Sequence, residues 1–220
     1  MGIVTKASVL GNLSGKIGNV ILSTWCGLDT IKEVSGERKK GKFSIKLARQ
    51  NELFKITGKF LTDSSGENLF KKGFQLRKNE HINPTNAATS YHMLNAIAGE
   101  YPEYSIDLTK VKFTRVLHST ETGWNAQFVS EEDDLKVQWE LNSFAEKTTR
   151  LDDEAFVVFY NSTAKRFVTI DGLQRSSLSC TFPPSFKKKM AGHDIFSWLY
   201  FISANGKLVS ETEYLGMITA

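Results

Sequence analysis

Short segments in which apolar and polar residues alternate fill most of residues 121–220, and no other feature of the chain constrains its fold as strongly. Residues 155–160 are instead continuously apolar, as expected for a strand that is covered on both faces. Asn205-Gly206 is a strong signal for a two-residue hairpin turn. These segments predict an antiparallel β-sandwich with strands at residues 124–129, 135–141, 155–160, 166–170, 176–182, 194–203 and 207–215.

The alternation also predicts which side chains point the same way. Successive side chains of a strand point to opposite faces of its sheet. Val137, Trp139 and Leu141 therefore share one face of their strand. One face of the strand at 194–203 carries Phe196, Trp198, Tyr200 and Ile202.

Two segments of the first half have a helical pattern. Apolar residues within 43–61 form a helical stripe. Residues 83–99 are the clearest helix, because Asn83 or Thr85 offers an N-terminal cap, Pro84 suits the first turn and Gly99 closes the end.

The remaining segments of the first half predict strands. They lie at residues 20–22, 31–34, 69–76 and 105–118, and Trp25 packs beside a glycine of the turn between the first two. We therefore predict a mainly β protein made of two antiparallel β-sandwiches, double jelly-roll-like, with one or two short helices in the first half. Residues 1–120 form the first sandwich with a helix inserted near 84–98, and residues 121–220 form the second.

Composition narrows the class of protein. The chain is 40% apolar and 24% charged with four prolines, as in an ordered globular protein. No uncharged apolar run reaches the roughly 18 residues that a membrane-spanning helix needs, and the first 15 residues lack the continuous apolar core of a secretory signal. We expect a protein kept in the cytoplasm, with Cys26 and Cys180 as free buried thiols.

Charge is distributed unevenly along the chain. Residues 1–80 carry 15 Lys and Arg against seven Asp and Glu, whereas residues 81–220 carry 13 against 17. A basic patch facing an anionic partner, either phospholipid or nucleic acid, is one interpretation, and a solvated basic face is the other. The candidate patch consists of Arg38, Lys39, Lys40, Lys42, Lys71 and Lys72, extended by Arg77 and Lys78.

No motif of the chain carries recognisable chemistry. The run from Gly11 to Ile17 resembles a phosphate loop, but only three residues separate its glycines and Ile17 stands where Ser or Thr is needed. The four acidic residues at 131–134 lack the spacing of a calcium loop and predict a solvated turn. His81, His92, His118 and His193 have no metal-ligand spacing. We therefore expect no enzyme activity, no cofactor and no metal.

Three blocks of the sequence resemble a Bacteroidota family of unknown function. Its N-terminal signature is matched by GNLSGKIGNVILSTWCGLDTIKEV (11–34), at Gly11, Ser14, Gly15, Lys16, Gly18, Asn19, Val20, Trp25 and Gly27. Residues 87–111 look like the family's central helix and strand, and 198–216 look like its closing hairpin. The loop after Val34 departs from the pattern, because SGERKKGK replaces a Pro-containing segment. The family label names no activity.

The predicted architecture resembles, in outline, the double jelly-roll major capsid proteins of small membrane-containing phages that infect flavobacteria. This resemblance implies a virion structural protein, a capsid subunit that self-assembles into trimers and an icosahedral shell. Its partners would be copies of itself, other virion proteins, and an internal membrane or packaged genome at the basic face. It would be located in the virion, after assembly in the bacterial cytoplasm.

The alternative function is a cytoplasmic β-sandwich binding or adhesion module that recognises a glycan or a protein. Exposed Trp and Tyr beside carboxylates at a loop end would favour this alternative. A deep pocket that gathers His and carboxylates from distant positions would instead favour an enzyme.

Overall fold

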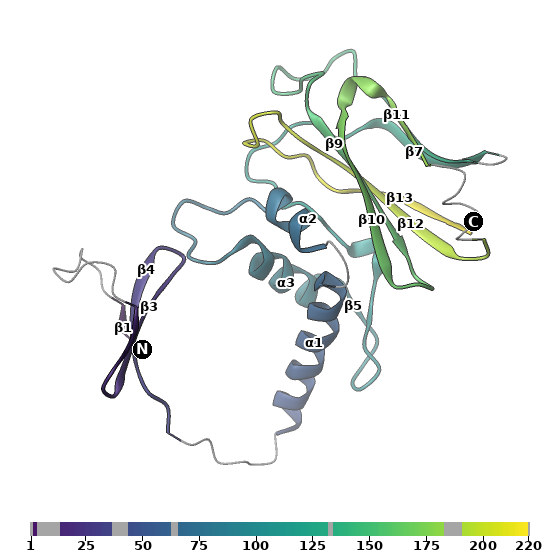
Figure 1. Ribbon diagram of the computed structural model, residues 1–220. Helices are drawn as coiled ribbons and strands as arrows, with labels where there is room; N and C mark the ends of the chain where they lie inside the picture. Colours follow the sequence, from purple (N-terminus) through teal and green to yellow (C-terminus); the bar gives the residue numbers. More distant parts are fainter. Residues whose placement is uncertain are drawn as a thin grey trace.

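Two antiparallel sheets pack face to face in the second half of the chain, and three helices cover the outer face of the larger one (Figure 1). The computed structural model describes residues 2–3, 14–36, 44–62, 66–131, 134–182 and 191–219, without the side chains of 2, 3, 66–68 and 131. The larger sheet has the order β10-β9-β12-β13 and the smaller one β11-β8-β7. The predicted mainly β class with an antiparallel β-sandwich is confirmed.

The strands of this sandwich follow the alternation of the sequence. The larger sheet contains β9 (Glu154–Asn161), β10 (Arg166–Gln174), β12 (Asp194–Ile202) and β13 (Glu213–Thr219). The smaller sheet contains β7 (Trp124–Glu131), β8 (Asp134–Glu140) and β11 (Ser179–Thr181). A 3-10 turn, η2 (Arg175–Ser177), connects β10 to β11.

Side chains of the two central strands alternate between two hydrophobic cores. Ala155, Val157 and Phe159 of β9 pack between the two sheets, whereas Phe156 and Val158 face the helices. On β12, all four residues predicted to share a face belong to or pack against the core beneath the helices. The continuous apolar run at 155–160 is thus explained, as predicted, by burial on both faces.

The described part of the first half contains three helices: α1 (Ile45–Thr62), α2 (Gly66–Gly73) and α3 (Pro84–Asn95). As predicted, the Asn83 side chain caps α3 by accepting from the Asn86 N–H. The helix ends at Asn95, before the predicted Gly99. The strand predicted at 69–76 is wrong. Residues 69–73 form the second half of α2, and Phe74 follows directly after it, with its N–H donating to the Phe70 carbonyl oxygen, so that a spacing of four brings the two rings to one side.

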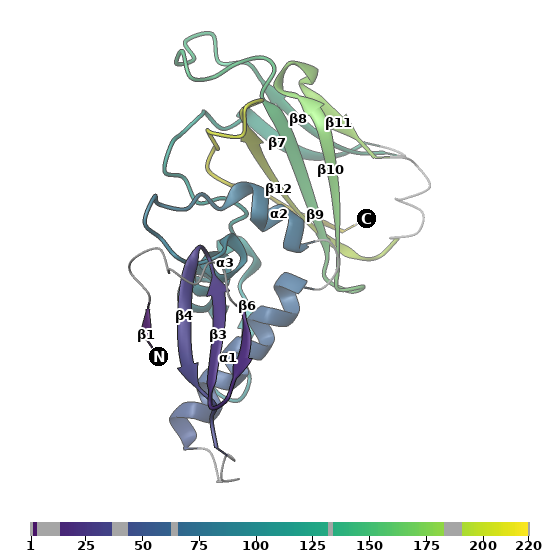
Figure 2. The same ribbon diagram turned by 60° about the vertical axis from the view of Figure 1, so that its left-hand side comes forward.

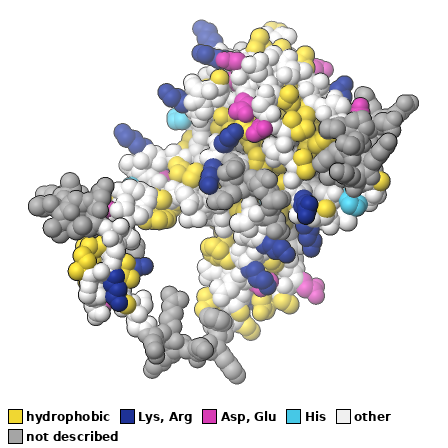
Figure 3. All heavy atoms as spheres, viewed as in Figure 1, with side chains coloured by type: hydrophobic (Ala, Val, Ile, Leu, Met, Phe, Trp, Pro, Cys, Tyr) yellow, Lys and Arg dark blue, Asp and Glu magenta, His cyan; other side chains and the backbone are white. Residues whose placement is uncertain are grey.

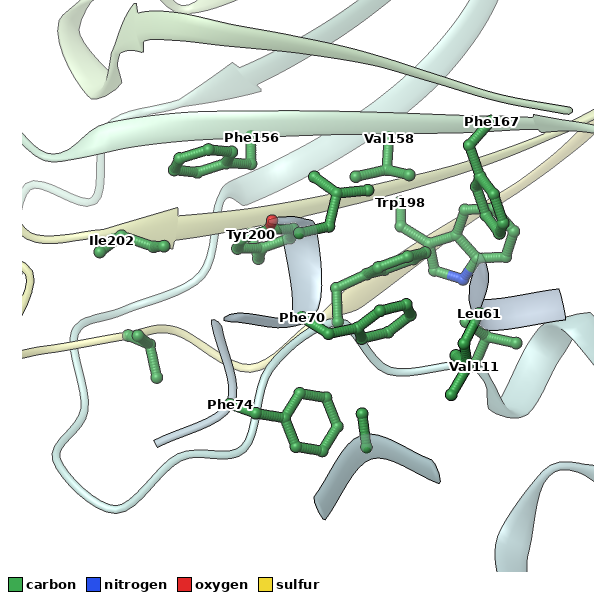
Figure 4. Packing of buried hydrophobic residues seen from close by; sticks show 14 of the residues in the cluster. Leu61, Phe70, Phe74, Val111, Phe156, Val158, Phe167, Trp198, Tyr200 and Ile202 are labelled. Carbon is green, nitrogen blue, oxygen red and sulfur yellow. The ribbon is translucent and has the colours of Figure 1, made fainter. Parts of the chain in front are cut away.

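The core beneath the helices is rich in aromatic rings (Figure 4). The Phe70 ring stacks on Phe113 with centroids 5.2 Å apart, and Phe156 stacks on Tyr200 at 5.0 Å. Burying each such side chain contributes about 1.5–3 kcal/mol. This packing joins α2 to β9 and β12, so the hydrophobic core is continuous across residue 120, where we predicted a boundary between two sandwiches.

An N-terminal sheet stands apart from the helices in Figure 1, and in Figure 2 it is seen in front of α1 and α3. It has the order β1-β4-β3-β2, with β1 (Gly2–Ile3), β2 (Gly15–Ile17), β3 (Val20–Trp25) and β4 (Leu28–Glu33). A short hairpin of β5 (Ile97–Ala98) and β6 (Ser105–Ile106) follows the helices. The described part of the first half therefore contains one small sheet, three helices and this hairpin, and not the two stacked sheets of the sandwich that we predicted for residues 1–120. Its helices bury their apolar faces against the sandwich of the second half instead.

Several local predictions differ from the structure. The strand predicted at 105–118 is limited to β6, because Asp107 accepts from the Thr109 N–H and starts the 3-10 turn η1 (Leu108–Lys110). Asp171-Gly172, predicted as a turn, is an irregularity inside β10. The strand predicted at 176–182 is shortened to β11, and the one predicted at 207–215 starts only at Glu213. Leu141 lies beyond the end of β8 and is exposed.

The turn between β3 and β4 is exposed. Cys26 and Gly27 both have positive φ, 48° and 76°, as the tightest hairpin turns require. Because this turn projects from the end of the sheet, the expectations that Cys26 is buried and that Trp25 is packed are wrong. Cys180 is a buried free thiol, as predicted.

Candidate functional site

One face of the N-terminal sheet carries an uncovered group of apolar side chains. Val20 and Leu22 point to the same side of β3, Val20 pairs with Ile17 of β2, and Leu22 pairs with Ile31 of β4. Residues directly opposite each other in a sheet share a face. We call Ile17, Val20, Leu22 and Ile31 the apolar sheet face. Ile17 is 63% exposed, and Val20 and Ile31 are also exposed.

Figure 3 shows hydrophobic side chains at the surface of the N-terminal sheet and at the free end of α1. On α1, Leu47 and Phe54 are both exposed and lie two turns apart on one side of the helix. The buried residues of this helix, Thr57, Phe60 and Leu61, are near its C-terminal end. The first part of α1 therefore offers a second uncovered apolar strip within the same chain.

Few polar contacts hold the N-terminal sheet against the rest of the molecule. The His81 Nδ1 lies 3.4 Å from the Cys26 carbonyl oxygen, between the segment before α3 and the β3–β4 turn. Between the described residues of the sheet and those of the body, this is the one hydrogen bond, and it is long and joins groups at the surface. The sheet is consequently held more by its connections along the chain than by packing.

The family of the chain can be stated from its sequence. Residues 12–216 match the model of a family described as "Family of unknown function (DUF6266)". The chain belongs to the DUF6266 family. No curated protein matches it. The match includes β2 to β4, the three helices and the sandwich, so both the N-terminal sheet and the body of this DUF6266 protein belong to the family pattern.

The predicted basic patch is only partly described. Arg38, Lys39, Lys40 and Lys42 lie outside the described residues. Lys71 and Lys72 are exposed in the last turn of α2. The Lys72 Nζ lies 4.0 Å from the Asp171 carboxylate and 4.9 Å from the Phe156 ring centre, so its charge is partly offset. The structure thus places two members of the patch together and leaves the other four untested.

The four histidines of this DUF6266 protein lie in separate environments. His92 is buried in the aromatic core, where its Nδ1 donates to the Ala88 carbonyl oxygen at 2.7 Å and its Nε2 accepts from the Lys112 N–H. Burial lowers the pKa of His92 to about 4. His193 accepts at Nδ1 from Asn161. Among the described residues, no three His, Cys, Asp or Glu side chains gather to hold a metal ion.

The other motifs named from the sequence have ordinary surroundings. Lys16 lies on the exposed strand β2 rather than in a phosphate-binding loop. In the acidic run, Glu131 pairs with Asp134 at the end of the β7–β8 hairpin, and residues 132–133 lie outside the described part. No helix in the described ranges is long and apolar enough to cross a membrane.

Sequence reasoning missed the apolar sheet face. The run Val20-Ile21-Leu22 predicted a strand, but a strand pattern does not tell which face is covered. The signal that could have found this face is the presence of apolar residues on all three paired strands. Ile17, Val20 and Ile31 are apolar at positions that a solvent-exposed face would fill with polar residues.

Proposed function

We propose that this protein is a structural subunit that assembles with copies of itself through its N-terminal sheet. The observation that carries the proposal is the apolar sheet face, which is exposed in a sheet that stands apart from the body of the molecule (Figure 1). A small sheet that buries no apolar face has little hydrophobic stabilisation of its own. Covering this face with another copy would supply that stabilisation.

The surface that fits the apolar sheet face best is the exposed strip of α1 on a second copy. Leu47 and Phe54 present apolar area of the same kind, and both surfaces occur once in each chain. A contact between two different surfaces of identical subunits repeats from copy to copy. Such a contact closes into rings or extends into larger assemblies, as structural subunits require.

The specific form that we propose is the one expected from the sequence, a virion coat protein that forms trimers and an icosahedral shell. What supports this form is the antiparallel β-sandwich, by analogy of fold. Other virion proteins, and an internal membrane or packaged genome near Lys71 and Lys72, are the further partners that this form implies.

The first experiment is size-exclusion chromatography with light scattering over a range of protein and salt concentrations. We expect a mass that is a multiple of 24.7 kDa, with a trimer for the coat-protein form. Val20→Lys places a charge on the apolar sheet face and should shift the protein toward the monomer. The matched control is Leu94→Lys on α3, which replaces an exposed apolar side chain outside both surfaces and should leave the mass unchanged.

The outcomes separate the two levels of the proposal. A wild-type protein that stays monomeric at every concentration would exclude self-assembly. Electron microscopy of the concentrated protein then tests the coat-protein form, for which closed shells are expected. Oligomers that depend on Val20 but never form shells would support the proposal of a structural subunit and would exclude its coat-protein form.

A further inference from the structure

The outer face of the small sheet contains a polar hollow of about 350 Å³. The sheet formed by β7, β8 and β11 lies on the side of the sandwich away from the helices (Figure 1). The polar residues that line the hollow are Asn125, Gln127, Lys136, Gln138, Glu140 and Ser179. The volume is within the range of small-molecule sites.

Strand register brings three of these side chains into one row. Gln127 of β7 and Ser179 of β11 are both paired with Gln138 of β8. The neighbours of Gln138 along β8, Val137 and Trp139, point into the core, so Gln138 points outward. Within the described part of the chain, the side-chain amides of Gln127 and Gln138 have no hydrogen-bond partner, which leaves donors and acceptors available to a ligand.

Backbone strain is concentrated at the same hollow. Asn125 and Leu178, two of its lining residues, have positive φ values of 47° and 59°, which is unusual for a residue as large as Leu. Asn125 lies in a bulge of β7, between the pairs formed by Trp124 and Gln127. Strained backbone and bulges both occur preferentially at binding sites, where they redirect side chains.

The Glu140 carboxylate lines the hollow, and an exposed tryptophan that is not itself part of the lining is its cross-strand neighbour. Trp124 is 51% exposed and is paired with Glu140 across the strands. The Asn125 Nδ2 donates to Glu140 Oε2 at 3.0 Å, which orients the carboxylate and leaves its other oxygen able to accept. Lys136 and Glu140 offset each other in charge, so the hollow favours an uncharged ligand rich in hydroxyl groups.

We propose that this hollow binds a small neutral oligosaccharide. Adjacent hydroxyl groups of a sugar can donate to and accept from the amides of Gln127 and Gln138 and the carboxylate of Glu140. The apolar C–H face of a sugar ring can lie on the exposed Trp124 indole, which has an apolar face and a polar edge. The site is distinct from the apolar sheet face and does not depend on self-assembly.

Isothermal titration calorimetry of the full-length protein tests the proposal. The affinity is measured for four sugars, cellotetraose, maltotetraose, mannotetraose and chitotetraose. At least one of these four sugars should bind at millimolar concentration or below. Trp124→Ala and Gln138→Ala should each weaken that binding by about tenfold or more. Trp124→Tyr keeps an aromatic ring and should retain most of the affinity.

The matched control is Trp25→Ala, which removes another exposed tryptophan from the N-terminal sheet and should leave the affinity unchanged. Thermal melting of each variant shows whether it remains folded. The proposal is overturned if none of the four sugars binds the wild type. It is equally overturned if a sugar binds and the folded Trp124→Ala and Gln138→Ala variants bind it as the wild type does.

Discussion

The Arg175 guanidinium lies 3.2 Å from the Asp153 carboxylate in the interior, with both side chains almost fully buried. Arg175 also donates to the carbonyl oxygens of Glu121 and Thr122, and it lies over the Phe201 ring at 3.8 Å. Residues 121–122 connect the helical half to β7. The ion pair therefore fixes this connection onto the sandwich.

Replacing Arg175 with Met should strongly destabilise the protein. The substitution leaves the Asp153 carboxylate buried without its cation, which typically costs about 3–5 kcal/mol. Urea denaturation measures the free energy of unfolding. The control is Arg166→Met on the exposed side of β10, which should change that free energy by less than about 0.5 kcal/mol. If both variants unfolded at the same urea concentration, the result would contradict a structural role for the Arg175–Asp153 ion pair.

The stability of the protein should fall as the pH is lowered from about 6.5 to about 4. Burial lowers the pKa of His92 to about 4, below its usual value near 6.5 in an unfolded chain. In this interval the unfolded chain binds a proton that the folded chain does not, so acid favours unfolding. The expected loss approaches about 3 kcal/mol.

Urea denaturation at a series of pH values checks the His92 prediction. The variant His92→Gln cannot take up this proton, so its stability should depend less on pH within the same interval. A slope identical to that of the wild type would exclude His92 as the cause. The carboxylates of Glu80 and Asp107, whose pKa values are lowered by Arg115 and Thr109 respectively, add their loss of stability mainly below pH 4.5, at the acid end of this interval and beyond it.

Two helical glycines should respond oppositely to substitution by alanine. A Cβ at Gly73 would collide with the Phe113 carbonyl oxygen, a backbone atom that cannot move away freely. At Gly58, inside α1, a Cβ meets no atom within 4 Å. Gly58→Ala should raise the melting temperature because alanine favours helix by about 1 kcal/mol, whereas Gly73→Ala should lower it. A rise in melting temperature for both variants would show that α2 and residue 113 are less tightly packed than in the structure.

The sequence predicted individual strands and helices better than it predicted which other parts of the chain pack against them. Alternation identified the strands of the sandwich, and Asn83 with Pro84 identified the start of α3. The segment at 69–76 was assigned to a strand because eight residues are too few to separate the two periods. Packing of α1 and α2 against β9 and β12 depends on contacts far apart in the chain, which no local pattern contains.

The polar hollow was outside the reach of sequence reasoning for a related reason. The alternation predicted that Val137 and Trp139 share one face of their strand, which puts Gln138 on the opposite face. Its neighbours Gln127 and Ser179 come from two other strands and meet it only through the register of the sheet. A shift of one residue would turn those side chains to the other face.

The two cysteines should differ in reactivity toward a thiol reagent such as iodoacetamide. Cys26 is exposed in the β3–β4 turn, whereas Cys180 is buried and its burial raises its pKa to about 11. The thiolate is the reactive form, so Cys180 should react only after unfolding. Mass spectrometry should find one label per folded chain, two after denaturation in urea, and none on folded Cys26→Ser. Labelling of folded Cys26→Ser would mean that the core between the sheets opens readily.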